Sequence, residues 1–488
     1  MIIRCELVSD QQEIAMTQNK NTSRRTFIKT ASATGAGLFL PYHFSAAPTL
    51  AFDTGSANDK VDIAVIGAGG MAGGNLNAAK KWMNLVAIAD ADSKRAARMN
   101  KGIGKGKADV YTDYRKILER DDIKVIHIAT PDHWHTKPLI EAMYAGKDVY
   151  CEKPLTLTID EGKLIRKVQK ETGRIVQVGT QQRSTFNKFV KAMAIVKQGR
   201  LGKIKRIEVS IGGAPESPVL PVAKAPVELD WDRWLGPAPK AEYHSLDRPS
   251  KKDKNGKPGK KGRPFSNGHY EFRWWYEYSG GKLTDWGAHH VDIAIWALEL
   301  NGQDAQPLSI EGTAKHPVEF KDGMPVAKDR YNTATEFNFT VKFPGGAEMV
   351  IRDKPGNGVL IEGDKGRIFV NRGSVKGKPV EDLEVNPLPE GAIQEVYKGF
   401  TPVENERKAH WANFFHCVDQ QVEPISDVHS HMRMLNICHL AGICGRLGRK
   451  LEWDAETETI KGDELANSML KRAYRTGYEI EMPVAVGG

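Results

Sequence analysis

The short segment VDIAVIGAGGMA, which begins at Val61, constrains the fold more than any other part of the chain. Its first six residues form an apolar run typical of a buried parallel strand. Glycines follow at once in the spacing GxGxxA: Gly67 permits a tight turn, Gly69 lets an anion approach the backbone, and Ala72 lets a helix pack closely. Because glycines are common in turns, the motif alone is weak evidence, and its surroundings decide what it means.

A second apolar run, LVAIAD, ends in Asp90, 23 residues after Gly67. An acid at this place hydrogen-bonds the adenosine ribose of NAD and disfavours the 2′-phosphate of NADP. The residues Ser93, Lys94 and Arg95 follow closely and could hold a phosphate. The sequence therefore predicts NAD as the cofactor, with NADP not excluded.

Apolar runs and helical segments then alternate along the chain, which is typical of βαβ units and a doubly wound parallel sheet, the Rossmann fold. The predicted strands are 124–130, 148–153 and 174–180, and the predicted helices between them are 135–146 and 159–173. At 488 residues the chain is long for a single domain, so a second domain is expected after this one.

The N-terminal region predicts export. SRRTFIK (23–29) precedes a weakly apolar Ala/Gly-rich stretch (31–47), the pattern of a twin-arginine signal. The paired arginines come late, which favours Met16 as the true start. A partner is therefore the twin-arginine export machinery, and the expected location is the periplasm. No apolar stretch approaches the roughly 20 residues that cross a bilayer, so stable membrane insertion is not expected.

The net charge of +9 comes largely from one Gly- and Pro-rich run at 251–264. It reads as a solvated loop without aromatic interleaving, so no nucleic-acid partner is predicted. Of the five cysteines, Cys5 precedes the signal. The other four (Cys151, Cys417, Cys438 and Cys444) lack CxxC and metal-ligand spacing and are expected to be buried free thiols.

Two polar segments follow predicted strands at the edge where such sheets bind ligands. In ATPDHWH, His133 and His135 form an HxH pair, but further ligands are missing nearby, so a cofactor-side loop is favoured over a metal site. In CEKPLT, Lys153 stands at a strand end and Pro154 stiffens its backbone. A lysine there can meet a hydroxyl or its oxyanion, although a surface lysine in a turn is the ordinary alternative.

The stretch LTDWGAHHVD lies at the start of a helix predicted from about 283 to 300. Because residues i and i+4 share a helix face, Asp285 and His289 are predicted neighbours, with Asp292 near the same side. His290 is turned about 100° away. A carboxylate that orients His289 suits a general base. The alternatives are a helix-capping Asp285 with two buried core histidines, and a less favoured metal site.

In this order and spacing, GAGGMAGG, Asp90, ATPDHWH, CEKPL and GGKLTDWGAHHVD resemble the Gfo/Idh/MocA family, which includes glucose–fructose oxidoreductase and inositol dehydrogenase. The resemblance implies a Rossmann domain and a C-terminal α/β domain with an open, mostly antiparallel sheet, which often forms the interface of a homo-oligomer. It also implies a catalytic set of Lys153, Asp285 and His289, and a cis peptide before Pro154.

The predicted organisation is a signal and linker at 1–57, a Rossmann domain at 58–182 and a substrate and oligomerisation domain at 183–488. In the second domain, strands are predicted at 204–211, 333–343, 346–353, 358–364 and 366–372, and helices at 404–420 and 429–448, which should pack back on the body.

The predicted cofactor contacts lie in the glycine turn and at the ends of the following strands. They are Gly67, Gly69, Gly70, Met71, Asp90, Thr130, Pro131, His135, Glu152 and Lys153. The predicted substrate contacts are Gln181, Arg183, Trp274, Trp275 and His290, and no metal is expected. The tryptophans belong to an insertion between Ile211 and Tyr270 and its continuation; packing is their ordinary role, and stacking on a sugar ring is the alternative.

These features predict an exported NAD-dependent oxidoreductase that acts on a hydroxyl of a carbohydrate or polyol. Because free NAD is scarce outside the cytoplasm, the cofactor is expected to be loaded before export and held tightly. A redox-neutral, NAD-dependent glycoside-cleaving enzyme is the main alternative, against which Lys153 argues. A non-catalytic sugar sensor is the second, and the joint presence of Lys153, Asp285 and His289 argues against it.

Overall fold

The computed structural model describes residues 60–249, 262–398 and 405–480. The predicted export signal, Cys5 and most of the basic run at 251–264 lie outside these residues. Within the described ranges, no helix is both long and apolar enough to cross a membrane.

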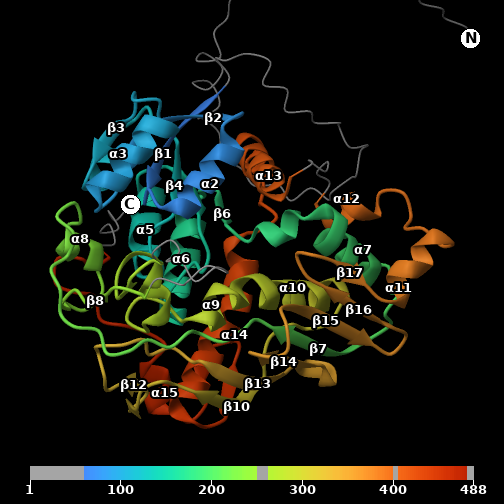
Figure 1. Ribbon diagram of the computed structural model, residues 1–488. Coiled ribbons are helices and arrows are strands. Elements are labelled where there is room, and N and C mark those ends of the chain that lie inside the picture. Colours follow the sequence, from blue (N-terminus) through green and yellow to red (C-terminus); the bar gives the residue numbers. More distant parts are fainter. Residues whose placement is uncertain (1–59, 250–261, 399–404, 481–488) are drawn as a thin grey trace, which may run out of the picture. The chain divides into compact units, whose positions relative to one another are not determined.

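The first sheet has six strands in the order β3-β2-β1-β4-β5-β6, and every neighbouring pair is parallel (Figure 1). This confirms the predicted doubly wound Rossmann sheet. The strands are β1 (Val61–Ile66), β2 (Met83–Ala89), β3 (Asp109–Tyr111), β4 (Val125–Ile128), β5 (Asp148–Cys151) and β6 (Val176–Val178). The helices between them are α2 (Gly70–Ala79), α3 (Ser93–Gly102), α4 (Arg115–Leu118), α5 (Thr136–Tyr144) and α6 (Ile159–Thr172).

The second sheet has nine strands in the order β17-β16-β15-β7-β14-β13-β10-β18-β19. Its pairs are antiparallel except β14 with β7, so the open, mostly antiparallel sheet is confirmed. The strands are β7 (Ile204–Ser210), β10 (Ser309–Lys315), β13 (Glu336–Lys342), β14 (Glu348–Arg352), β15 (Gly358–Gly363), β16 (Arg367–Val370), β17 (Val375–Lys376), β18 (Leu451–Asp454) and β19 (Thr459–Ile460). The strands at 309–315 and 451–454 had not been predicted.

One face of this second sheet is covered and the other is polar. In β13, Phe337, Phe339 and Val341 are buried, whereas the alternating residues Glu336 and Asn338 are exposed. This is the period-2 pattern of a sheet with one buried face. The long helices α10 (Gly287–Leu300) and α14 (Val428–Leu447) pack on the buried face (Figure 1).

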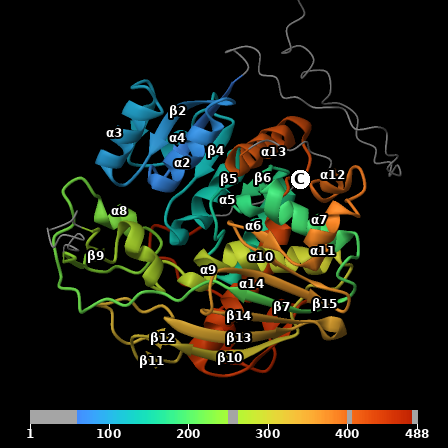
Figure 2. The ribbon, with the colours of Figure 1, turned by 45° about the vertical axis from the view of Figure 1, so that its right-hand side comes forward.

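Helix α13 (Glu406–Gln420) packs on the first sheet although it lies late in the sequence. Its Trp411 stacks on Tyr150 of β5 at a ring-centroid distance of 4.1 Å and is fully buried. The helix also contacts α2, and Figure 2 shows it beside the Rossmann strands. Chain segments on both sides of residue 182 therefore share one apolar core.

The insertion after β7 forms a small apolar cluster of its own around Trp234, Trp275 and Tyr278. Two backbone hydrogen bonds join it to the loop after β2: Asp230 N donates to Ala91 O, and Ser93 N donates to Glu228 O, both at 2.9 Å. Its elements are α8 (Trp231–Leu235), β8 (Ser245–Leu246), β9 (Phe265–Ser266) and a 3-10 helix (His269–Trp274).

The predicted helix over 283–300 is interrupted. The structure has α9 (Lys282–Asp285), then Trp286, then α10. The predicted free thiols are confirmed for the cysteines at 151, 417, 438 and 444, which are buried and unpaired. The remaining elements are α7 (Lys191–Lys197), α11 (Lys378–Glu381), α12 (Ala392–Val396), α15 (Glu464–Ser468), β11 (Phe320–Lys321) and β12 (Met324–Pro325).

Candidate active site

A cavity of about 760 Å³ lies at the carboxyl edge of the parallel sheet. This volume falls in the range of roughly 300–1,000 Å³ found for ligand sites. All ten predicted cofactor contacts line it. The insertion supplies much of the remaining wall, including Tyr243, His269 and Arg273, and Gly477 and Tyr478 close it from near the C-terminus.

The glycine turn fits a dinucleotide. Gly67 has a φ of +93°, and a Cβ there would lie 2.7 Å from the backbone of Ala129 and Thr130, so no larger residue fits. Gly69 caps α2, and the first turn of this helix has neither a side-chain cap nor an acidic residue. The helix N-terminus is therefore left for an anion such as a pyrophosphate.

Asp90 is held in the place where a ribose would sit. Its carboxylate accepts hydrogen bonds from Ala68 N at 2.5 Å and from Asp92 N at 2.7 Å. Burial raises the pKa of Asp90, and these backbone donors and Arg95 oppose that shift. Arg95 also pairs with Asp92 at 3.2 Å.

His135 lies between two backbone carbonyl groups and holds the loop after β4. Its Nδ1 lies 2.7 Å from Pro154 O and its Nε2 lies 3.0 Å from Thr130 O. His133 points to the Trp234 carbonyl at 3.1 Å. In the described ranges no group of three or more His, Cys, Asp or Glu side chains could hold a metal ion. Both histidines of the HxH pair thus contact backbone carbonyl groups, and their role beside a cofactor stays a prediction.

Glu152 is a buried carboxyl on the cavity wall. Its Oε1 accepts from Asn75 Nδ2 at 2.5 Å and from Gln181 Nε2 at 3.3 Å. Burial raises the pKa of Glu152 to about 7, although the charge of Lys153 opposes the shift. Gln181, a predicted substrate contact, is therefore a partner of Glu152 and of the Tyr150 hydroxyl.

Lys153 lines the cavity and pairs with Asp285, which is not one of the lining residues. Lys153 Nζ donates to Asp285 Oδ1 at 2.7 Å and to Asp285 O at 3.1 Å. The peptide before Pro154 is cis, as the family resemblance implied. Arg273 Nε lies 3.5 Å from the same carboxylate oxygen. Burial alone would raise the pKa of Asp285, but Lys153 and Arg273 outweigh it and hold this pKa well below its usual value.

His289 is held neutral and is not hydrogen-bonded to Asp285 among the described contacts. Its Nδ1 is buried without a partner. Burial lowers the pKa of His289 well below its ordinary value, and Lys153 and Arg372 lower it further, whereas Asp285 raises it only weakly. The expected direct pairing is absent because the helix breaks at Trp286 and because Lys153, from the other domain, takes the carboxylate.

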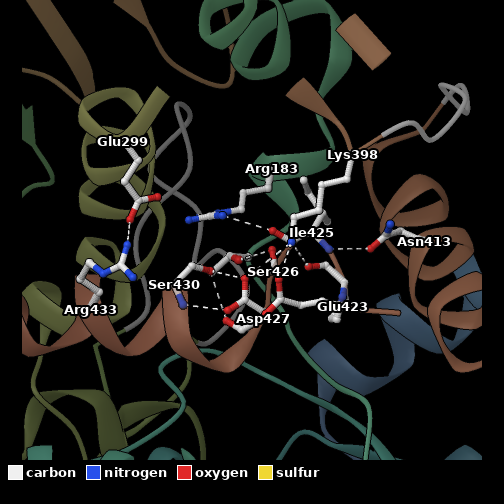
Figure 3. Close-up of polar contacts among 12 residues, drawn as sticks. Arg183, Glu299, Lys398, Asn413, Glu423, Ile425, Ser426, Asp427, Ser430 and Arg433 are labelled. Atoms are coloured by element: carbon white, nitrogen blue, oxygen red, sulfur yellow. Dashed lines mark hydrogen bonds and ion pairs between the residues drawn. The ribbon is translucent and has the colours of Figure 1, made fainter. Parts of the chain in front are cut away.

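Arg183 and Asp292 form a buried pair away from the cavity. Two hydrogen bonds of 2.8 Å join the guanidinium to the carboxylate, and the side chains are 4% and 1% exposed. A third bond, from Nη1 to Ile425 O at 3.2 Å, ties Arg183 to the loop before α14 (Figure 3). Arg183 was expected near the substrate; the structure instead places it in this buried pair with Asp292 of α10, which lies three residues after His289.

The other predicted substrate contacts are also packed. Trp274 Nε1 donates to Glu271 Oε2 at 3.0 Å, and Trp275 Nε1 donates to Ser266 O at 3.1 Å. His290 is fully buried, with Nε2 2.9 Å from Asn357 Oδ1. None of the five predicted substrate residues lines the cavity. The insertion tryptophans therefore take the packing role that is ordinary for this residue.

The cavity holds charged residues that the sequence did not single out. Arg273 lies within FRWWYEY, where the flanking aromatic residues drew attention away from it. Asp132 lies beside the HxH pair; it accepts from Ser279 Oγ at 2.5 Å, and burial raises its pKa to about 6. For Asp132 the available signal was a charged residue within a motif already placed at the ligand edge; Arg273 stood in an insertion and carried no such signal.

A Rossmann cavity whose lining lysine pairs with an aspartate, with a neutral histidine close to that pair, is typical of nucleotide-dependent oxidoreductases. Residues 61–180 match the model described as oxidoreductase family, NAD-binding Rossmann fold, and residues 256–480 match that family's C-terminal alpha/beta domain. The chain belongs to this family, Gfo/Idh/MocA.

Curated relatives match over part of their length. The chain is 33% identical to the inositol 2-dehydrogenase of Rubrobacter xylanophilus over 130 residues, which is 26% of this chain and 37% of that protein. It is 31% identical to a glycosyl hydrolase family 109 protein of Solibacter usitatus over 151 residues, 29% of this chain and 34% of that protein. The match thus spans about a third of the length of these relatives.

A solved structure shows the same fold over most of the chain. The WlbA dehydrogenase from Chromobacterium violaceum, in complex with NADH and UDP-GlcNAcA, aligns with a TM-score of 0.56 at 16% identity. The alignment covers 82% of this chain and 98% of that one.

Proposed function

We propose that this protein is an exported, NAD-dependent oxidoreductase that acts on a hydroxyl group of a carbohydrate or polyol. The observation that carries the proposal is the ion pair between Lys153 and Asp285 at the end of a cavity that fits a dinucleotide. When bound, NAD supplies the redox chemistry by accepting or returning a hydride. The residues that would hold it are those of the glycine turn, Asp90 and the loop after β4.

The side chains at this end can accept the hydroxyl proton of the alcohol and stabilise charge that develops on its oxygen. Lys153, fixed by Asp285, donates a hydrogen bond to the reacting oxygen and stabilises charge that develops on it. His289 is neutral, so a ring nitrogen can accept the hydroxyl proton. Asp285 acts through Lys153: its carboxylate holds the ammonium group in place and balances its charge.

Export by the twin-arginine route, to the periplasm in a bacterium with two membranes, is part of the proposal. This route carries folded proteins, which suits a protein that acquires NAD in the cytoplasm. The insertion supports tight retention, because it walls the cavity and is tied by backbone hydrogen bonds to the loop after Asp90. The purified protein should therefore carry bound nicotinamide.

The test is a screen of sugars and polyols with the purified protein, read by nicotinamide absorbance and by product analysis. We expect oxidation of at least one sugar or polyol, lost in Lys153→Ala and in His289→Ala. If both variants keep every activity of the parent, the assignment of this site fails. Release of bound nicotinamide on denaturation tests retention separately, and localisation of the protein with and without Arg24→Lys and Arg25→Lys tests export.

The second candidate is a redox-neutral glycosidase, which oxidises a sugar, eliminates its aglycone and reduces the product again. The observation that supports this second candidate is the match to a glycosyl hydrolase family 109 protein. Aglycone release from a glycoside without accumulation of NADH would support this candidate over the dehydrogenase.

A further inference from the structure

Two cations lie around the ring of Trp286, beside the candidate base His289. Lys282 Nζ is 5.7 Å from the centroid of this ring, and the guanidinium of Arg372 is 4.9 Å from it. The ring of His289 is centred 6.1 Å from the same centroid. Both cations and His289 therefore lie around one aromatic ring, and the charge of Arg372 acts on His289.

Arg273 adds a third cation on the cavity side. Its guanidinium stacks on the rings of Tyr270 and Phe272, with 4.6 and 4.7 Å to their centroids. It also lines the cavity and lies 3.5 Å from Asp285. Aromatic stacking fixes a guanidinium while leaving its donors available to a ligand.

These cations lack matching carboxylates. Asp285 is already bound by Lys153 at 2.7 Å. Burial lowers the pKa of Arg372, and Glu406 opposes this shift more than Asp285 does, but Glu406 accepts a hydrogen bond from Thr185 and forms no ion pair with Arg372 among the described residues. Among the residues that the structure describes, neither Lys282 nor Arg372 has a carboxylate within ion-pair distance. With its amide turned so that each end meets a suitable partner, Gln182 accepts from Arg372 Nε at 3.1 Å, which positions the arginine without neutralising it.

The excess of positive charge lowers the pKa of neighbouring groups. After burial, Lys153 and Arg372 are the main causes that lower the pKa of His289. Burial also lowers the pKa of Lys282; Asp285 opposes this shift, and the like charges of Lys153 and Arg273 add to it. A bound anion would offset this field and would make His289 a stronger base.

We propose that the substrate is an anionic carbohydrate, whose carboxylate, phosphate or sulfate group is received by Lys282, Arg372 and Arg273. The inference rests on the proposed function, since it names the substrate class of the same site. A fixed cluster of ammonium and guanidinium groups is the chemistry that selects an anion on an otherwise neutral sugar.

The experiment compares sugars that share one ring and differ in a single group: glucose with glucuronate and glucose 6-phosphate, and galactose with galacturonate. We expect the best anionic member to exceed its neutral counterpart in kcat/KM by roughly 10- to 100-fold. The preference should weaken as ionic strength rises. The glucuronate and glucose 6-phosphate arms distinguish a carboxylate from a phosphate ligand.

The variants Lys282→Met and Arg372→Met should each lower the ratio of anionic to neutral kcat/KM by about tenfold. The matched control is Lys205→Met, which removes an exposed lysine from β7 and should leave the ratio unchanged. Equal kcat/KM within every pair, or a preference that both variants retain, would overturn the inference.

Failure of the proposed function can be distinguished from failure of this inference by a binding measurement. If no sugar changes the redox state of the nicotinamide, calorimetric titration of the purified protein with glucuronate, glucose 6-phosphate and the neutral sugars still decides the inference. Binding of an anionic sugar that Arg372→Met abolishes supports it, and absence of such binding rejects it.

Discussion

The two ends of the cavity are built in different ways. The dinucleotide end is built around one continuous segment, β1, the glycine turn and α2, together with Asp90 and the loop after β4 at the ends of the next strands. The reacting end joins Lys153 of the Rossmann domain, Arg273 of the insertion, and Asp285 and His289 on either side of a helix break. Local sequence patterns therefore predict the dinucleotide end. At the reacting end, groups that are distant in the sequence compete for the same partner, so the sequence alone does not show which groups pair.

The largest effect should come from Arg183, which spacing placed near the substrate and the structure places in a buried pair. Arg183→Met leaves the Asp292 carboxylate buried and unpaired, so we expect a loss of about 3–5 kcal/mol in the free energy of unfolding. Denaturant titration measures this loss. The double variant Arg183→Met/Asp292→Leu should recover most of it, because no unpaired charge remains. A stable Arg183→Met protein with impaired substrate binding would restore the substrate role.

At the reacting end, Lys153→Met should lower kcat by about 10²- to 10³-fold, the usual cost of removing one donor to a developing oxyanion. Bound nicotinamide should be measured in the same preparation, so that loss of cofactor is separated from loss of chemistry. A variant that keeps its cofactor and its rate would show that Lys153 serves only to anchor Asp285.

A double-mutant cycle tests which partner Asp285 has. The substitutions Asp285→Asn, Lys153→Met and His289→Asn are combined in pairs, and the free energy of unfolding is measured. Groups in contact couple by about 0.5–3 kcal/mol. We expect coupling in this range between Asp285 and Lys153, and less than about 0.5 kcal/mol between Asp285 and His289. The reverse order would reinstate the pairing that helical spacing predicts.

The sequence predicted both sheets, the main helices and all ten residues of the cofactor wall, because each follows from a local pattern of apolar runs, glycines and strand ends. It did not predict the break at Trp286. Asp285 and His289 interact electrostatically, as neighbours would, but Asp285 hydrogen-bonds Lys153 and not His289. The sequence also misplaced Arg183, since a buried arginine is recognised only when its carboxylate partner, 109 residues away, is known. Arg273 was not predicted because it stands in an insertion that no sequence motif placed at the ligand edge.

At the dinucleotide end, two glycines of one motif should respond differently. Gly67→Ala forces a Cβ to 2.7 Å from the backbone at Ala129 at a φ of +93°, so we expect a loss of about 1–3 kcal/mol in unfolding free energy, together with loss of bound nicotinamide. Gly70→Ala is the matched control, because nothing lies within 4 Å of its added Cβ. Equal losses of stability in the two variants would contradict the geometric account of the turn.

The smallest effect concerns Glu152, where the two ends meet. Its pKa rises from 4.5 to about 7 on folding, so between these pH values the folded protein binds more protons than the unfolded chain. The contribution of Glu152 to the free energy of unfolding is then greatest below pH 4.5. It is lost as the pH rises through 7, by on the order of 1–3 kcal/mol. Glu152→Gln keeps the Oε1 acceptor for Asn75 and removes the titration, so thermal unfolding at pH 5 and pH 8 should differ less than in the parent. Asp132 shifts in the same direction and leaves a residual slope. If Glu152→Gln leaves the pH dependence unchanged, folding does not raise the pKa of Glu152. The hydrogen-bond donors around Glu152 would then stabilise its charged form enough to offset burial.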